Sequence, residues 1–227
     1  MKVLRQTCWL VLVAMALVNV PQVGAKQNGI VGYSGKQGAT CDDDCHVGGV
    51  TPLVRFEGTQ RVMADALATF RFVVTSQASK QKVAGFNVAA SDGVLDIVAG
   101  QSEHVEFDEL THDAPKSNVD GEAGWQFTWH APSQPGQYVL YGAGLSANGN
   151  GTDGGDDSNL TTLNVTVTSE PIGDANCDTL VSAADVSAVA KLLPAGVPGA
   201  CNGADVNGDG AVNVADVAAV VTAVFGD

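Results

Sequence analysis

The chain reads Asp174-Ala175-Asn176-Cys177-Asp178 near its C-terminus, and 31 residues later it repeats the pattern as Asp205-Val206-Asn207-Gly208-Asp209. A further aspartate follows at the twelfth position of each copy. Side-chain oxygens at positions 1, 3, 5 and 12, a carbonyl at position 7 and a water or hydroxyl at position 9 are the ligand set of a calcium loop. The pattern therefore predicts two Ca²⁺ sites, a first loop with ligands at Asp174, Asn176, Asp178, Leu180, Ser182 and Asp185, and a second loop with ligands at Asp205, Asn207, Asp209, Ala211, Asn213 and Asp216.

The same apolar pattern follows each loop. Apolar residues recur at i, i+3, i+4 and i+7, which places them on one face of a helix. No helix-length segment directly precedes either loop, so each unit is half of an EF-hand, and we expect the two halves to pack as a pseudo-symmetric pair. The apolar positions are Val186, Val189, Ala190 and Leu193 after the first loop, and Val217, Val220, Val221 and Val224 after the second.

With these two ligand sets and matched helices, residues 174–227 resemble the type I dockerin family, whose fold is two calcium loop-helix units. The resemblance implies a docking module, a cohesin-like or other surface protein as its partner, and an association with polysaccharide breakdown in bacteria. The alternative is that calcium only stabilises a small domain. Positions 10 and 11, which often carry cohesin-contacting hydroxyls in this family, are Ala183-Ala184 and Val214-Ala215 here.

Two further features distinguish the loops. The sharp turn at position 6 favours glycine, which Gly210 supplies in the second loop, whereas the first loop has the β-branched Thr179. We therefore expect the second calcium site to be the stronger one. Cys177 and Cys201 are expected to form a disulfide in an oxidising compartment, worth about 3–4 kcal/mol by chain entropy.

Residues 1–25 have the features of a signal peptide. Lys2 and Arg5 precede an apolar stretch that is too short for a comfortable membrane span, and Val23-Gly24-Ala25 is a small-residue cleavage motif. We expect a secreted bacterial protein, extracellular or held at the cell surface, that is not an integral membrane protein after cleavage. Loss of the two basic residues changes the net charge from −14 to −16, which argues against nucleic acid as a partner.

A second motif, Cys41-Asp42-Asp43-Asp44-Cys45-His46, follows the predicted cleavage site. Attachment of c-type haem uses C-x₂-C-H, in which two thioethers hold the porphyrin and the histidine binds iron; this C-x₃-C-H is one residue longer. His112, at the end of an expected strand, is a candidate second ligand. The alternatives are a small disulfide loop between Cys41 and Cys45 or, less favoured, a zinc site of two Cys and two His.

The middle of the chain is predicted to be an antiparallel β-sandwich of the immunoglobulin type, because short strands follow one another without helices. The alternating Trp125, Phe127 and Trp129 are expected in its core rather than on a sugar-binding face. Gly142–Asn159, rich in Gly, Asn and Asp, is expected to be a long loop. The expected strands are Leu53–Glu57, Thr69–Thr75, Val83–Ala89, Leu95–Val98, Val105–Leu110, Trp125–His130, Gln137–Gly142 and Thr162–Thr168.

Residues 29–168 also resemble the bacterial choice-of-anchor V domain, a relative of the Reeler domain, which implies a surface protein with an interchangeable C-terminal attachment module. The resemblance rests on Cys41, Cys45, His46, Gly48-Gly49, Thr111-His112, Trp125 to Pro132 and Tyr141 to Gly151. The whole chain is thus expected to be mostly β with a small two-helix C-terminal module. The expected divisions are 1–25 signal peptide, 26–50 Cys/His segment, 51–168 β-sandwich, 169–173 linker and 174–227 dockerin-like calcium module.

The sequence offers no catalytic motif of the G-x-S-x-G, H-E-x-x-H or phosphate-loop kind. An acidic run at Glu103, Glu106, Asp108 and Glu109 is interpreted as a solvated strand edge rather than a glycosidase pair. The leading hypothesis is a secreted, non-catalytic calcium-binding protein whose module docks the β-sandwich in polysaccharide-associated assemblies. The alternatives are an extracellular c-type haem electron-transfer protein and an accessory carbohydrate-binding component.

Overall fold

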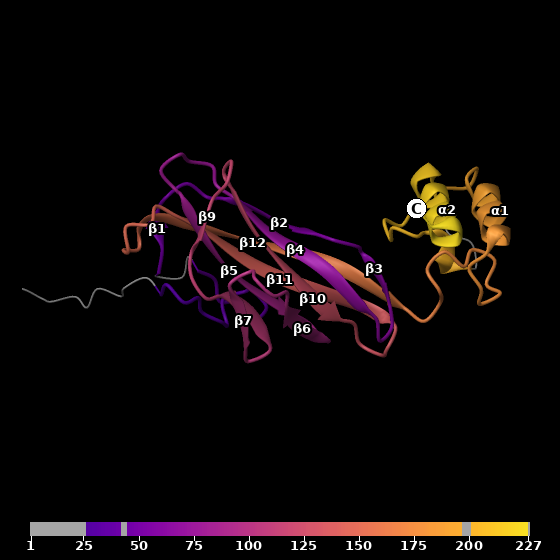
Figure 1. The fold of residues 1–227 in the computed structure, drawn as a ribbon, viewed down its shortest axis with the longest axis horizontal. Coiled ribbons are helices and arrows are strands. Elements are labelled where there is room, and N and C mark those ends of the chain that lie inside the picture. Colours follow the sequence, from indigo (N-terminus) through magenta and orange to yellow (C-terminus); the bar gives the residue numbers. More distant parts are fainter. Residues whose placement is uncertain (1–25, 42–44, 197–200, 227) are drawn as a thin grey trace, which may run out of the picture.

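The computed structural model describes residues 26–41, 45–196 and 201–226. Figure 1 shows an elongated β-sandwich with a small helical module at one end. The chain is thus mostly β with two C-terminal helices, as the sequence predicted. The predicted signal peptide, residues 1–25, lies outside the described residues. Among the residues described, no helix is long and apolar enough to cross a membrane.

Two sheets form the sandwich, and nearly all neighbouring strands in them are antiparallel. The exceptions are β1 and β3, which both run parallel to β12. The smaller sheet has the order β2 (Leu53–Glu57), β4 (Leu67–Thr75), β10 (Glu122–His130) and β6 (Val94–Ile97). The larger sheet has the order β1 (Val47–Gly48), β12 (Gly154–Thr168), β11 (Gly136–Ala147), β5 (Val83–Ala90), β8 (Glu109–His112) and β7 (Glu103–Glu106), with β3 (Arg61–Met63) beside β12 and β9 (Lys116–Ser117) beside β5.

The interior between the sheets is aromatic. Across β10 and β4, Trp125 lies opposite Phe72 and Phe127 lies opposite Phe70. The rings of Phe70 and Phe127 stack with their centroids 5.9 Å apart. These side chains and Trp129 are fully buried, so each contributes about 1.5–3 kcal/mol by removal from water. The predicted core position of Trp125, Phe127 and Trp129 is confirmed, and the stripe has no exposed face for a sugar.

A hairpin replaces the long loop that was predicted at Gly142–Asn159. Strands β11 and β12 pair through most of this region, and residues 148–153 lie between them. A Cβ on Gly142 would meet the ring of Phe72, and one on Gly144 would meet valines of the facing sheet. The prediction was wrong because these glycines allow the strand to approach the other sheet closely, and do not mark a turn.

The strand predicted at Val105–Leu110 is also wrong, because it is divided into β7 and β8. Phe107 and Asp108 between them have φ angles of 47° and 64°, so the chain turns there. The acidic run is not a solvated edge throughout, since Glu103 and Glu109 are 6 % and 7 % exposed. Burial raises the pKa of Glu103 to about 7. Oε2 of Glu109 accepts a backbone N–H of the N-terminal segment at 2.8 Å.

The helical module has a small core of its own. Each α-helix begins with a capping box, in which Ser182 caps the first helix and Asn213 caps the second. Val189 and Val220, one from each helix, are fully buried in the cluster between them. The helices predicted after both loops are confirmed. The elements are α1 (Ala183–Leu192), the short 3-10 turn η1 (Asn202–Ala204) and α2 (Val214–Phe225).

Candidate functional site

The last carboxylate of the first loop organises the surrounding backbone. Oδ1 of Asp185 accepts the backbone N–H groups of Ala175 at 2.9 Å and Asn176 at 3.1 Å. Its Oδ2 accepts the N–H of Ser182, the residue that caps α1, at 2.8 Å. One buried carboxylate therefore connects the start of the loop to its end and to the helix that follows.

The second loop repeats these contacts position by position. Asp216 occupies the place of Asp185 and is also fully buried. The duplicated sequence therefore folds into a duplicated hydrogen-bond network. The donors to Asp216 are the backbone N–H groups of Val206 at 2.9 Å, Asn207 at 3.3 Å and Asn213 at 2.9 Å.

The carboxylates at position 1 close the turn of each loop. Oδ2 of Asp174 accepts the N–H of Thr179 at 2.8 Å, and Oδ2 of Asp205 accepts that of Gly210 at 2.9 Å. Positions 3, 5 and 7 match between the loops in the same way, so the two predicted ligand sets share these internal hydrogen bonds. The matched pairs are Asn176 Nδ2 to Asp178 Oδ2 at 3.0 Å and Asn207 Nδ2 to Asp209 Oδ2 at 3.1 Å, then Leu180 N–H to Asp178 Oδ1 at 2.9 Å and Ala211 N–H to Asp209 Oδ1 at 2.8 Å.

These loops bury negative charge. Within the described ranges, no ion pair joins the carboxylates at positions 1 and 12 to a basic side chain. Buried carboxylates without an ion-pair partner are costly, and a hard divalent cation removes that cost while accepting oxygen ligands. In those same ranges, no three His, Cys, Asp or Glu side chains lie close enough together to hold a metal ion. The individual ligands therefore stay a prediction, supported by the charge balance of Asp174, Asp185, Asp205 and Asp216, which are between 0 and 5 % exposed.

The loops differ at positions 4 and 6, where the backbone is left-handed. Cys177 and Thr179 have φ angles of 59° and 71° in the first loop. Gly208 and Gly210 have φ angles of 75° and 87° in the second. A left-handed conformation costs a residue with a Cβ roughly 1–2 kcal/mol, so the strain predicted at Thr179 is confirmed. The predicted disulfide from Cys177 to Cys201 is also confirmed, with a Cα–Cα distance of 5.5 Å.

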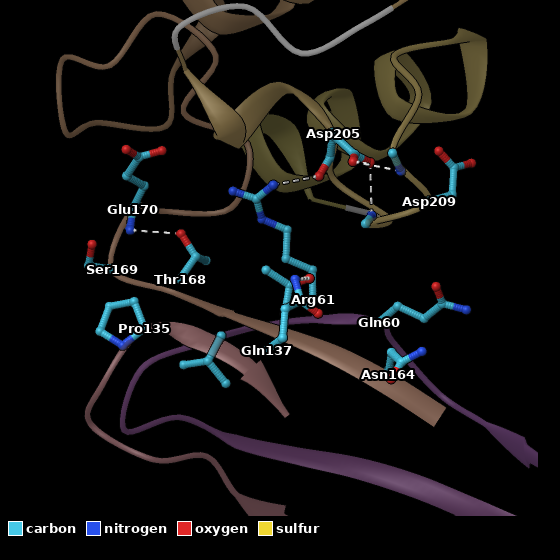
Figure 2. Close-up of a pocket in the computed structure, with 14 residues that line it drawn as sticks. Gln60, Arg61, Pro135, Gln137, Asn164, Thr168, Ser169, Glu170, Asp205 and Asp209 are labelled. Carbon is cyan, nitrogen blue, oxygen red and sulfur yellow. Dashed lines mark hydrogen bonds between the residues drawn. The ribbon is translucent and has the colours of Figure 1, made fainter. Parts of the chain in front are cut away.

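Arg61 connects the sandwich to the second loop. It extends from β3, is 4 % exposed, and donates from Nη1 to the backbone oxygen of Asp205 at 3.1 Å (Figure 2). Gly208 lies against the same strand, because a Cβ on it would be 3.1 Å from the Cβ of Arg61. Burial lowers the pKa of Arg61, and the negative charges of Asp205 and Glu170 oppose that shift. The second loop is thus packed directly on the sandwich.

A polar cleft of about 570 Å³ lies beside this contact. Gln60 and Asn164 line it from the sandwich, and Asp209 lines it from the module (Figure 2). Arg61 crosses the cleft from one part to the other. The cleft therefore results from the way the module rests on the sandwich.

The end of the sandwich opposite the helices contains a cavity of about 300 Å³. Cys41, Cys45, His46 and His112 all line it, although His46 precedes β1 and His112 ends β8. The structure thus brings together the four residues of the haem prediction, and the haem itself stays a prediction. The remaining walls are mainly apolar and include Ile30, Tyr33, Phe86 and Leu145.

Both histidine rings in this cavity are held through Nδ1. Nδ1 of His46 lies 3.3 Å from Oδ2 of the buried Asp156. Nδ1 of His112 lies 3.1 Å from the backbone N and 3.3 Å from the backbone O of Phe86, and its tautomer decides which of them it bonds. Burial lowers the pKa of His112, which favours the neutral ring. A Cβ on Gly85 would collide with this ring.

Three of these residues were missed by the sequence interpretation. Asp156 is 110 residues from His46 and was assigned to a loop. Arg61 is 144 residues from Asp205, and Gly85 was assigned only to a strand. Neither spacing nor periodicity reports contacts of this kind, because the fold creates them.

Comparison with known families finds a match to the C-terminal module. Residues 172–224 match the family described as the dockerin type I domain. This match supports a protein-docking module and, because dockerin type I domains bind calcium, a calcium ligand for it. A search of curated proteins finds no match to the chain. The resemblance of residues 29–168 to the choice-of-anchor V domain stays a prediction.

Solved structures show only distant similarity. A DUF4466 family protein from Parabacteroides merdae has 8% identity and a TM-score of 0.37 over 54% of this chain and 46% of its own. A cohesin module of a Clostridium perfringens family 33 glycoside hydrolase has 11% identity and a TM-score of 0.37 over 52% of this chain and 96% of its own. This chain therefore spans about half the length of the first protein. TM-scores this low carry no argument about function.

Proposed function

We propose that this chain is a secreted, non-catalytic docking protein. Its C-terminal module binds two Ca²⁺ ions and attaches the β-sandwich to a cohesin-like or other surface protein, in assemblies associated with polysaccharide. The match of residues 172–224 supports the docking role. The observation that carries the calcium role is the duplicated network in which a buried aspartate, Asp185 or Asp216, binds both the start of its loop and the cap of its helix.

Calcium and docking are connected because the loops determine where the helices begin. Ser182 and Asn213 are each position 9 of a loop and the N-cap of the next helix. Without a cation, the buried charges of Asp185 and Asp216 repel the position 1 carboxylates. Opening of the loops then removes both caps, each worth about 1 kcal/mol, from a module with a small core. Loss of calcium therefore unfolds the surface that a partner binds.

The second helix presents an apolar stripe to solvent. The stripe follows the spacing i, i+4, i+7 and i+11, so its residues share one helical face. Val214, Val221 and Phe225 in it are 77 %, 38 % and 69 % exposed. Contiguous exposed apolar surface is typical of protein interfaces, so we place the partner contact on α2. The stripe is Val214, Ala218, Val221 and Phe225, and the matched positions of the first unit are the smaller or more polar Ala183, Ser187, Ala190 and Pro194.

Matched helix variants test this proposal. The mature chain is passed over immobilised cohesin modules in excess calcium and then in excess chelator. We expect chelation to abolish binding and Val221→Asp to weaken it by about tenfold or more, as for a buried interface residue. Ala190→Asp, at the matched position of α1, should change affinity by less than about twofold. Binding that persists in chelator, or a larger effect of Ala190→Asp, would contradict the proposal. Melting curves in calcium show that both variants are folded.

The structure offers a candidate site for one of the two alternative functions and removes the surface first considered for the other. Electron transfer through a covalent haem is a separate candidate, because it depends on the cavity at Cys41, Cys45, His46 and His112 and not on the module. A carbohydrate-binding role loses the surface first considered for it, since Trp125 and its neighbours are buried.

A further inference from the structure

Two adjoining cavities meet at the end of the sandwich opposite the helices. The cavity of about 300 Å³ described above is joined by one of about 310 Å³, and both are lined by His46, Gly85, His112 and Leu145. Ligand pockets in proteins typically occupy about 300–1,000 Å³. His46 and His112 therefore stand at the boundary of a space that is large enough for a cofactor.

Both imidazoles leave Nε2 available to a ligand. Nδ1 of His46 donates to Asp156, and in one tautomer Nδ1 of His112 donates to the backbone oxygen of Phe86 at 3.3 Å, which leaves Nε2 of that ring without a hydrogen. In the part of the chain that the structure describes, neither Nε2 takes part in a hydrogen bond. Gly85 leaves room for the His112 ring, because a Cβ there would be 2.8 Å from Nε2. Proteins orient metal-binding histidines in this way, through a hydrogen bond at the other ring nitrogen.

The donor set suits haem better than a bare ion. A tetrahedral zinc site would need both cysteines as metal ligands, and in a secreted chain such thiols are more often oxidised. Haem iron takes four ligands from the porphyrin, so two imidazoles complete it, and cysteines bind the edge of the ring instead of the metal. The apolar walls at Ile30, Tyr33, Phe86 and Leu145 suit a macrocycle.

We propose that this space holds one covalently attached haem, with His46 and His112 as axial ligands and Cys41 and Cys45 as attachment points. Each thiol adds its S–H across one vinyl C=C of the porphyrin. A C–S and a C–H bond form, the S–H bond and the vinyl π bond are lost, and no oxidant is needed. Asp156 is a positioning residue that acts through His46. The protein thereby carries a redox centre that is independent of calcium-dependent docking.

Expression with haem-attachment machinery tests the proposal. We expect the denatured chain to retain the mass of one haem, and the native protein to show a Soret band and a sharp reduced α band of low-spin iron. His112→Ala should keep the covalent haem and lose the low-spin spectrum. His104→Ala should leave the spectrum unchanged, because His104 is on the neighbouring strand and binds Asp113 at 2.8 Å. Melting curves confirm that each variant is folded.

Further variants keep the test decisive. If His112→Ala does not fold, His112→Met should retain low-spin iron and raise its reduction potential, since Met/His ligation raises potentials. Ser at both Cys41 and Cys45 should abolish covalent attachment. A colourless chain whose mass is two hydrogens short would show a Cys41–Cys45 disulfide and overturn the proposal. Covalent haem with a spectrum insensitive to both changes at His112 would overturn the axial assignment.

Discussion

The two predicted calcium loops have the same sequence pattern and nearly the same hydrogen-bond network, but they contact the rest of the protein differently. The first loop places Cys177 and Thr179 in left-handed conformations and is tied to Cys201 by a disulfide. The second has Gly208 and Gly210 at the matched positions and rests on strand β3 of the sandwich. A repeat thus determines the local network, while the residue at position 4, the first of its two left-handed positions, depends on what each copy contacts.

These contacts explain which residue occupies position 4 of each loop. A side chain at Gly208 would press on Gln60 and Arg61, so the second copy needs a small residue there to pack on the sandwich. In the first copy, the same position carries the cysteine that holds the loop to the segment before η1. Thr179 keeps one compensating contact, because its Oγ1 donates to the backbone oxygen of Asp178 at 2.6 Å.

Removal of the predicted calcium ligands from one loop at a time should have the largest effect on the stability of the module. Asp205→Ala with Asp216→Ala abolishes the second site, and Asp174→Ala with Asp185→Ala abolishes the first. At calcium a thousandfold above Kd, one site contributes about 4 kcal/mol to the free energy of unfolding. We expect calorimetry to show one remaining site in each variant and a lower Tm for the second-loop pair. An equal or larger loss of Tm for the first-loop pair would contradict this ranking of the sites.

Removal of the disulfide should act mainly on the first loop. Cys177 and Cys201 are 24 residues apart, and Ser at both positions should lower the free energy of unfolding of the module by about 3–4 kcal/mol. Calcium titration of the folded variant should show weaker binding at the first loop and little change at the second. Equal weakening of both loops would show that the bridge supports the module as a whole.

Arg61→Leu should act only on the second loop. The change removes a hydrogen bond from a charged donor to Asp205, worth about 1.5–3 kcal/mol. We expect the lower value, because Nε and Nη2 of Arg61 have no hydrogen-bond partner among the described residues. Titration calorimetry should show about tenfold weaker calcium binding at the second loop. Arg55→Leu, at an arginine of β2 whose side chain is 44% exposed, is the matched control. An unchanged second loop would mean that the sandwich does not support it.

Substitution of the residues at position 6 should have the smallest effect on calcium binding. Thr179→Gly relieves a left-handed conformation worth roughly 1 kcal/mol, so the first loop should bind calcium about fivefold more tightly. Gly210→Ala should weaken the second loop by a similar factor, because a Cβ there meets open space and only the backbone is strained. No gain from Thr179→Gly would mean that its hydrogen bond to Asp178 offsets the strain.

The parts of the molecule that follow local rules were predictable from the sequence. The loops, helices and disulfide depend on spacings within residues 174–227, and the alternation at Trp125, Phe127 and Trp129 marks a strand whose period is local. The hairpin at Gly142–Asn159 was not predictable, because its glycines are required by close packing against side chains of the facing sheet, which are distant in the sequence.

The sequence also predicted the candidate sites only in part. Spacing identified the carboxylates of both loops and the motif of Cys41, Cys45 and His46. His112, which lines the same cavity, was suggested by its place at the end of an expected strand. Spacing did not identify Asp156 behind His46, or Arg61 beside Asp205, because each pair is more than a hundred residues apart in the chain. Residues that position a ligand depend on tertiary neighbours, which no single stretch of sequence encodes.

The contact of Arg61 with the second loop also bears on how the protein is displayed. The helices lie at one end of the sandwich and β1, beside the cavity, lies at the other (Figure 1). Because the module rests on β3, rotation about the linker at 169–173 is restrained. A partner bound to α2 would therefore hold the protein at one end. A ligand in the cavity would lie at the opposite end, at a distance from the partner set by the length of the sandwich.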